Sequence, residues 1–147
     1  MEHFMKLRAF INIEKFDSRA LSRMSGAIRL LEANPENICW IRLSLNPAPN
    51  AIKLLKANQE NIDWDNLSAN PAPGAIKLLE ANPEKINWDN LSGNIAPEAI
   101  NLLEANPEKI NWDMLSRNPS AIKLLEANQE KIDWTWMSEN PAPGAIK

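Results

Sequence analysis

The chain has 147 residues and a net charge of −3, and its 44% apolar and 24% charged residues exclude an intrinsically disordered or fibrous protein. One cysteine and one histidine exclude a disulfide framework and a histidine-based metal cluster. No apolar run approaches the roughly 20 residues that cross a bilayer, so we expect an intracellular protein without membrane contact, cofactor or metal.

Residues 1–26 are predicted to form an N-terminal capping segment. They fit the sequence pattern of the rest of the chain poorly, but Leu21-Ser22 matches Leu91-Ser92 in register, with Ser18 where the later units have tryptophan. A solenoid needs such a degenerate end unit, because the apolar face of its first full unit would otherwise be exposed. The segment carries a net charge of +2, whereas residues 27–147 carry −5.

Residues 27–147 are predicted to form five tandem repeats followed by the stub of a sixth. The repeats share the theme A-I-x-L-L-x-A-N-[PQ]-E-x-I-x-W-x-x-[LM]-S-x-N and recur every 24 residues, except for one interval of 22. A fixed period of this length indicates stacked units that bury their apolar faces against one another. The repeats start at Ala27, Ala51, Ala75, Ala99 and Ala121, and the stub starts at Ala145.

Each repeat is predicted to contain two short helices. The apolar residues of 75–81 lie on one helical face, and Pro73 suits a first helical turn. Asn82, which tolerates a left-handed conformation, and Pro83 then end the helix. A second helix follows, for which Asn87 and its counterpart Asp63 are predicted N-caps.

The predicted fold is therefore all-α, an α-solenoid of two-helix repeats of 22–24 residues. Leucine-rich repeats have a similar period and give an alternative, a horseshoe-shaped binding module containing strands. That alternative fits less well, because Asp65 and Asp89 occupy a position where the leucine-rich signature requires an apolar residue.

One tryptophan recurs in every repeat. A row of aromatic rings could stack bases or sugars, but we favour a structural role, a ladder in the core between repeats, because the tryptophan always accompanies an isoleucine two residues earlier. The ladder comprises Trp40, Trp64, Trp88, Trp112 and Trp134.

Two asparagine columns and a serine column are equally regular. Asn82 and Asn94 represent the asparagine columns and Ser92 the serine column. An asparagine at a helix end most often bonds to local backbone, and we predict this local capping role for all three columns. Cys39 stands where other repeats have Asn or Asp, and we predict an N-cap position and not a reactive thiol.

Three positions of the second helix vary between repeats, at 14, 15 and 18 residues after the first alanine. Their spacing puts them on one helical face. A constant frame with one variable face is typical of a recognition surface, although drift on a solvated face explains the same pattern. The candidate binding face comprises Arg42, Leu45, Asn66, Asn90, Met114, Arg117, Trp136 and Glu139.

The ten residues from Leu79 to Trp88, L-E-A-N-P-E-K-I-N-W, resemble short tandem repeats found in proteins of giant DNA viruses of the marseillevirus type. The resemblance extends over residues 27–147, with departures at Cys39, Ile41 and Arg42 in the first repeat and at Gln59 and Gln129. It implies a viral repeat protein without known catalysis, located in the host cytoplasm or in the virion.

We expect a non-enzymatic scaffold that binds a host or viral protein. No nucleophile accompanies a base, so the sequence indicates no catalytic residues. The acidic repeats also argue against nucleic acid, which binds through Lys and Arg. The alternative is a self-assembling structural element, a homo-oligomer formed through the last repeat, whose segment 134–137 has no polar cap in the sequence.

Overall fold

The chain folds into an array of short helices in two rows. The computed structural model describes residues 13–143, and within them every repeat forms the two predicted helices, so the fold is an all-α solenoid. The first helices of the repeats form one row: α3 (Ile28–Glu32), α5 (Pro49–Ala57), α7 (Pro73–Glu80), α9 (Pro97–Glu104) and α11 (Ile122–Glu126). The second helices form the other: α2 (Ser18–Arg23), α4 (Trp40–Ser44), α6 (Trp64–Ser68), α8 (Trp88–Ser92), α10 (Trp112–Ser116) and α12 (Trp134–Met137).

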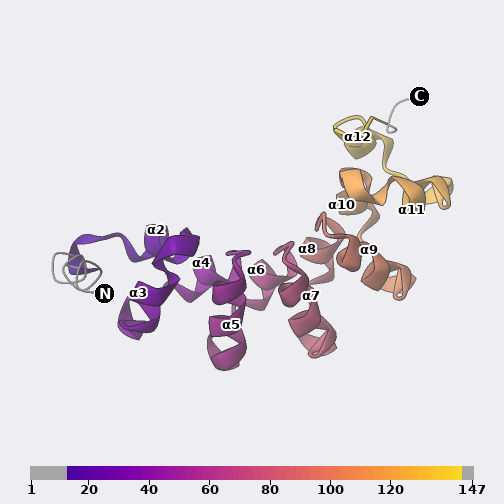
Figure 1. Ribbon diagram of the computed structural model, residues 1–147. Coiled ribbons are helices and arrows are strands. Elements are labelled where there is room, and N and C mark those ends of the chain that lie inside the picture. The colour runs from indigo at the N-terminus through magenta and orange to yellow at the C-terminus, as the bar shows by residue number, and fades with distance from the viewer. Residues whose placement is uncertain (1–12, 144–147) are drawn as a thin grey trace.

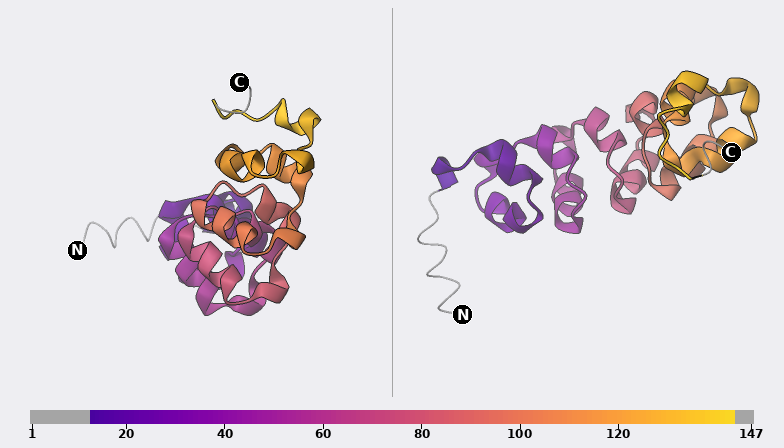
Figure 2. Two further views of the ribbon diagram at one scale, coloured as in Figure 1. Left: turned by 90° about the vertical axis from the view of Figure 1, so that its right-hand side faces the viewer. Right: turned by 90° about the horizontal axis from the view of Figure 1, so that it is seen from above.

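The array is elongated and bent (Figures 1 and 2). Each helix of the second row contacts its counterpart in the next repeat, as α6 contacts α8, and from α2 to α9 each helix also contacts the one beside it in the other row, as α6 contacts α7. In Figure 1 the row from α2 to α12 lies along the inner side of the bend, and the row from α3 to α11 lies along the outer side. The inner row therefore presents the second helices of all repeats to one concave side.

Short 3₁₀ helices join the elements. Within the repeats these are η3 (Pro35–Asn37), η4 (Gln59–Asn61), η5 (Pro83–Lys85), η6 (Pro107–Lys109) and η8 (Gln129–Lys131). The residue before η5, Asn82, has φ −139° and ψ 62°. No residue of the described range, glycine included, has a positive φ. The prediction of a left-handed turn at Asn82 is therefore wrong, because the 3₁₀ turn reverses the chain without one.

The core lies between the two rows. Leu79 from α7 and Leu91 from α8 are fully buried, as are Ala75 and the equivalent side chains of the neighbouring repeats. Ile86, just after η5, is also buried. Helices of four to nine residues are unstable alone, so burial of these columns between successive repeats supplies the stability of the array.

A ladder of polar side chains links each repeat to the one before it. Ser92 Oγ donates to Trp88 O at 2.8 Å and accepts from the N–H of Asn111 in the next repeat at 3.0 Å. Asn94 Nδ2 donates to Ser68 O and to Asn70 O, at 2.9 and 3.0 Å. The same contacts recur at the other full junctions, and the serines and asparagines that make them are buried: Ser44, Ser68, Ser116, Asn46, Asn70, Asn118 and Asn140.

These contacts correct the prediction of purely local roles for two of the three columns. Asn94 Oδ1 does accept from Ala96 N–H, so its local turn is as predicted, but its amide bridges repeats because the helix end faces the preceding one at the junction. The other asparagine column is local: Asn82 Nδ2 donates to Leu78 O at 2.8 Å. The N-caps are also as predicted, with Asn87 Oδ1 accepting from Asn90 N–H and Cys39 capping without its side chain.

The N-terminal segment contributes one helix to the inner row. Helix α2 contacts α4, and Ser22 holds the place of the ladder serine by accepting from the N–H of Cys39 and from Asn46 Nδ2, both at 2.9 Å. The short helices η1 (Ile13–Lys15) and η2 (Ser25–Ala27) flank α2. Residues 1–12, and the stub of the sixth repeat from Ala145, lie outside the described residues.

The short interval between Ala99 and Ala121 changes the start of one helix. Helix α7 begins with Pro73 and runs for eight residues, whereas α11 runs for five and is preceded by η7 (Pro119–Ala121). The two missing residues therefore turn the first part of the helix into a 3₁₀ turn.

Residues 13–143 contain no β-strand. The leucine-rich alternative is therefore wrong, since each such repeat requires a strand. None of the helices in this range has both the length and the apolar character needed to cross a bilayer.

Candidate binding face

The predicted binding face lies on the inner row. Its residues come from two positions of the repeat. The first position is the third residue of each second helix, which is half-buried in every repeat, and the second position lies just after the end of the same helix. The first position holds Arg42, Asn66, Asn90, Met114 and Trp136. The second position holds the remaining candidate residues, Leu45, Arg117 and Glu139. The structure thus brings the candidate residues together along one face.

In the middle of this face, side chains form hydrogen bonds with the preceding repeat. Asn90 Nδ2 donates to Asp65 O at 2.9 Å, and Asn87 Nδ2 donates to Asp65 Oδ1 at 2.7 Å. Asn111 Nδ2 makes the same 2.7 Å bond to Asp89 Oδ1. Asn90 is therefore part of a junction between repeats as well as part of the face.

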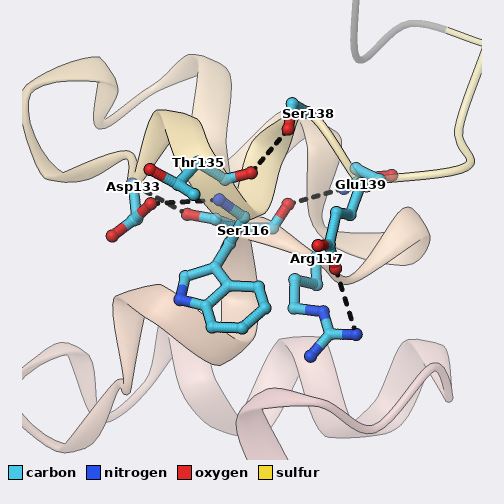
Figure 3. A network of polar contacts seen from close by, with 8 residues as sticks. Ser116, Arg117, Asp133, Thr135, Ser138 and Glu139 are labelled. Atoms are coloured by element: carbon cyan, nitrogen blue, oxygen red, sulfur yellow. Dashed lines mark hydrogen bonds and ion pairs between the residues drawn. The ribbon is translucent and has the colours of Figure 1, made fainter.

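Three larger side chains meet between α10 and α12. Arg117 forms an ion pair with Glu139 at 3.3 Å, with both side chains about half exposed (Figure 3). Its guanidinium also lies over the Trp136 ring, 4.5 Å from the ring centroid. An exposed ion pair contributes roughly 0–1 kcal/mol, so neither contact prevents this arginine from binding a partner.

A cavity of about 290 Å³ opens beside this group, lined by Gly93, Met114, Arg117, Asn118 and Pro119. Gly93 matters here because a Cβ at this position would lie 3.2 Å from Met114 Cε. The absence of a side chain at Gly93 thus provides the space that Met114 occupies at the edge of the cavity.

The tryptophan ladder lies at the edge of the core. Trp40, Trp64, Trp88 and Trp112 are half-buried and pack against the core, but Trp134 is 65% exposed. The prediction of a core position is wrong for Trp134, because within residues 13–143 no later repeat covers it. Two rings carry a lysine of the following repeat: Lys85 Nζ lies 5.9 Å from the Trp64 centroid, and Lys131 Nζ lies 4.7 Å from that of Trp112.

A row of exposed carboxylates runs beside the tryptophans. Asp65, Asp89 and Asp113 are the second residues of α6, α8 and α10. The acid–amide bonds described above join the first two of these to the next repeat, but the counterpart of Asn111 in the last repeat is Asp133. The pairing therefore stops at Asp113, where a second carboxylate replaces the amide.

The outer row has a second cavity, which the sequence did not lead us to predict. It has a volume of about 380 Å³ between α5 and α7, with Lys56 and Lys77 at its polar edge and Ile52 and Leu78 among its apolar lining. One departure from the repeat could have indicated it, because Lys56 stands where the other repeats have a glutamate. Gly74 allows close packing, since a Cβ there would lie 2.8 Å from Ile52 Cγ2.

Among the described residues, no three His, Cys, Asp or Glu side chains gather as they would around a metal ion. Comparisons of the chain with protein-family models, with curated proteins and with solved structures give no match.

Proposed function

We propose that the chain is a non-enzymatic repeat protein that binds a protein partner through the binding face. The observation that carries this proposal is the junction of α10 and α12, where Met114, Arg117 and Trp136 surround or adjoin a cavity on an otherwise regular frame. Aromatic residues, Met and Arg are the residue types enriched in protein interfaces. The resemblance to giant-virus repeats extends the proposal to a viral protein in the host cytoplasm or the virion.

The distribution of constant and variable positions supports the same function. Positions that hold the repeats together, such as Leu91, Ser92 and Asn94, are buried and nearly constant between repeats. The binding-face positions are partly exposed and differ from repeat to repeat. Solenoids use such extended concave surfaces for recognition, because changes on the surface leave the stacked frame intact.

The test replaces the distinctive side chains by those that other repeats carry at the same positions. The binding-face variant combines Arg42→Asn, Met114→Asn, Arg117→Ala and Trp136→Asn, as in Asn66, Asn90 and Ala69. The control variant changes four exposed residues of the outer row: Arg29→Ala, Lys53→Ala, Lys77→Ala and Lys123→Ala.

Each protein is immobilised and exposed to extract from infected cells, and the captured proteins are identified after cross-linking. We expect one or more proteins to be retained by the original chain and by the control variant, but lost from the binding-face variant at an unchanged melting temperature. Retention of the same proteins by the binding-face variant would refute this function.

Self-association through the last repeat is the second candidate, supported by the 65% exposure of Trp134. Light scattering over a range of concentrations tests it. A mass that rises with concentration, and returns to that of the monomer with Trp134→Gln, supports self-association; a constant monomer mass refutes it.

A further inference from the structure

The inner row presents carboxylates and aromatic rings in the same order in three successive repeats. In α6, α8 and α10 a half-buried tryptophan is followed directly by an exposed aspartate, and none of these helices contains Lys or Arg. The whole repeat region carries a net charge of −5. From α4 to α12 the aspartates of the inner row outnumber its two arginines, Arg42 and Arg117, so this concave face is complementary to a ligand that carries several positive charges.

The rings already hold cations from the chain itself. Lys131 lies over Trp112 and Lys85 over Trp64, at 4.7 and 5.9 Å from the centroids, which is within the range of a cation–π interaction. Among the described residues no such cation lies over Trp88 or Trp134. These two rings remain open to a cation from another molecule.

The acid–amide pairing is missing at the last junction, and we expect a cation of the partner to bind there most strongly. At two junctions the aspartate accepts from an asparagine amide at 2.7 Å. At the third junction Asp113 and Asp133 hold the equivalent positions, and neither forms an ion pair within residues 13–143. Asp133 Oδ1 accepts only the Trp136 N–H, at 3.0 Å, and at this junction no side-chain amide donates to the preceding aspartate, as it does at the other two.

We propose that the partner presents an extended, lysine- or arginine-rich segment to this face. One basic side chain binds between Asp113 and Asp133 with its alkyl chain against Trp134, another binds Asp89 with its alkyl chain against Trp88, and a third binds Asp65. Packed helices lie about 8–10 Å apart, and three residues of a segment in the polyproline II conformation, which puts every third side chain on the same face, span about 9 Å. A basic residue at every third position therefore matches the spacing of the aspartates. This inference rests on the proposed function and specifies the chemistry of its partner.

Fluorescence anisotropy with a labelled synthetic peptide tests the inference. The probe has lysine at every third position, and its comparison peptide has glutamine in place of every lysine. The acidic-row variant carries Asp89→Asn, Asp113→Asn and Asp133→Asn, which keep an acceptor at each position. The matched control removes three charges from the outer row: Glu80→Gln, Glu104→Gln and Glu126→Gln.

We expect the lysine peptide to bind the original chain and the matched control alike. The acidic-row variant should bind it at least about fivefold more weakly, and added salt should weaken the binding further. Equal binding of the glutamine peptide, or equal weakening in the control, overturns the inference. If the lysine peptide does not bind while partner capture still depends on the binding face, the proposed function stands and the basic partner is wrong.

Discussion

The side-chain amide of Asn94 donates to the main-chain carbonyl of Asn70, 24 residues earlier, at 3.0 Å. The same nitrogen also donates to Ser68 O at 2.9 Å, and Asn94 Oδ1 accepts from Ala96 N–H at 2.9 Å. One buried side chain thus satisfies three backbone groups in two repeats. Because buried polar groups without partners are destabilising, this residue contributes more to the junction than an apolar residue of its size.

Replacing Asn94 should therefore destabilise the array strongly. Asn94→Ala leaves two carbonyls and one N–H without their partner in a buried site, and we expect a loss of about 3 kcal/mol in the free energy of unfolding. Asn82→Ala is the matched control, because Asn82 makes one local bond and is half-buried, and it should cost about 1 kcal/mol. Urea denaturation followed by circular dichroism measures both values; equal losses would contradict the bridging role.

The tryptophans should differ in their contribution to stability according to position. Trp88 packs half-buried against the core, so Trp88→Ala should lower the free energy of unfolding by about 2 kcal/mol, below the roughly 3–5 kcal/mol of a fully buried ring. Trp134 is 65% exposed, and Trp134→Ala should cost less than about 1 kcal/mol. Thermal unfolding of the two variants checks the order, and a larger effect at Trp134 would show that this ring is covered in solution.

Two glycine substitutions should change the free energy of unfolding in opposite directions. At Gly74 a new Cβ would lie 2.8 Å from Ile52 Cγ2, so Gly74→Ala should destabilise by about 1 kcal/mol through overpacking between α5 and α7. At Gly26 nothing lies within 4 Å of the new Cβ, and Gly26→Ala should stabilise by about 0.5 kcal/mol, since alanine restricts the unfolded chain. The melting temperature should fall in the Gly74→Ala variant and rise in the Gly26→Ala variant, compared with the original chain.

Removing one carboxylate from the last junction should stabilise the free protein. Asp133→Asn provides the amide that Asn87 and Asn111 provide elsewhere, and Asn is as good an N-cap as Asp. We expect a gain of about 0.5 kcal/mol at neutral pH, because the substitution removes repulsion between like charges. Melting curves of the variant and the original chain test this, and a loss of stability would contradict the repulsion.

The repeat itself made much of the fold predictable. The spacing of Ala75, Ile76 and Leu79 indicated a helix, Asn87 indicated the N-cap of a second one, and both form. The register of Ser22 with the ladder serines was also predicted, and its contacts with Cys39 and Asn46 confirm it.

The contacts between repeats were less predictable, because local and long-range roles have the same sequence pattern. Asn82 and Asn94 both follow a helix, yet one bonds four residues back and the other reaches the preceding repeat. Only the stacking of the repeats determines which amide faces a neighbour. The same holds for Trp134, which has the same place in its repeat as Trp112 but whose exposure depends on what lies beside it.

The polar ladder also has a direction. At each junction the later repeat donates, from its asparagine amide and its N-cap N–H, and the earlier repeat accepts, as Asn94 and Asn111 illustrate. During synthesis the earlier repeat leaves the ribosome first. Each new repeat therefore meets acceptors that are already in place, so the chain can complete its junctions one after another as it is made, without waiting for its C-terminal half.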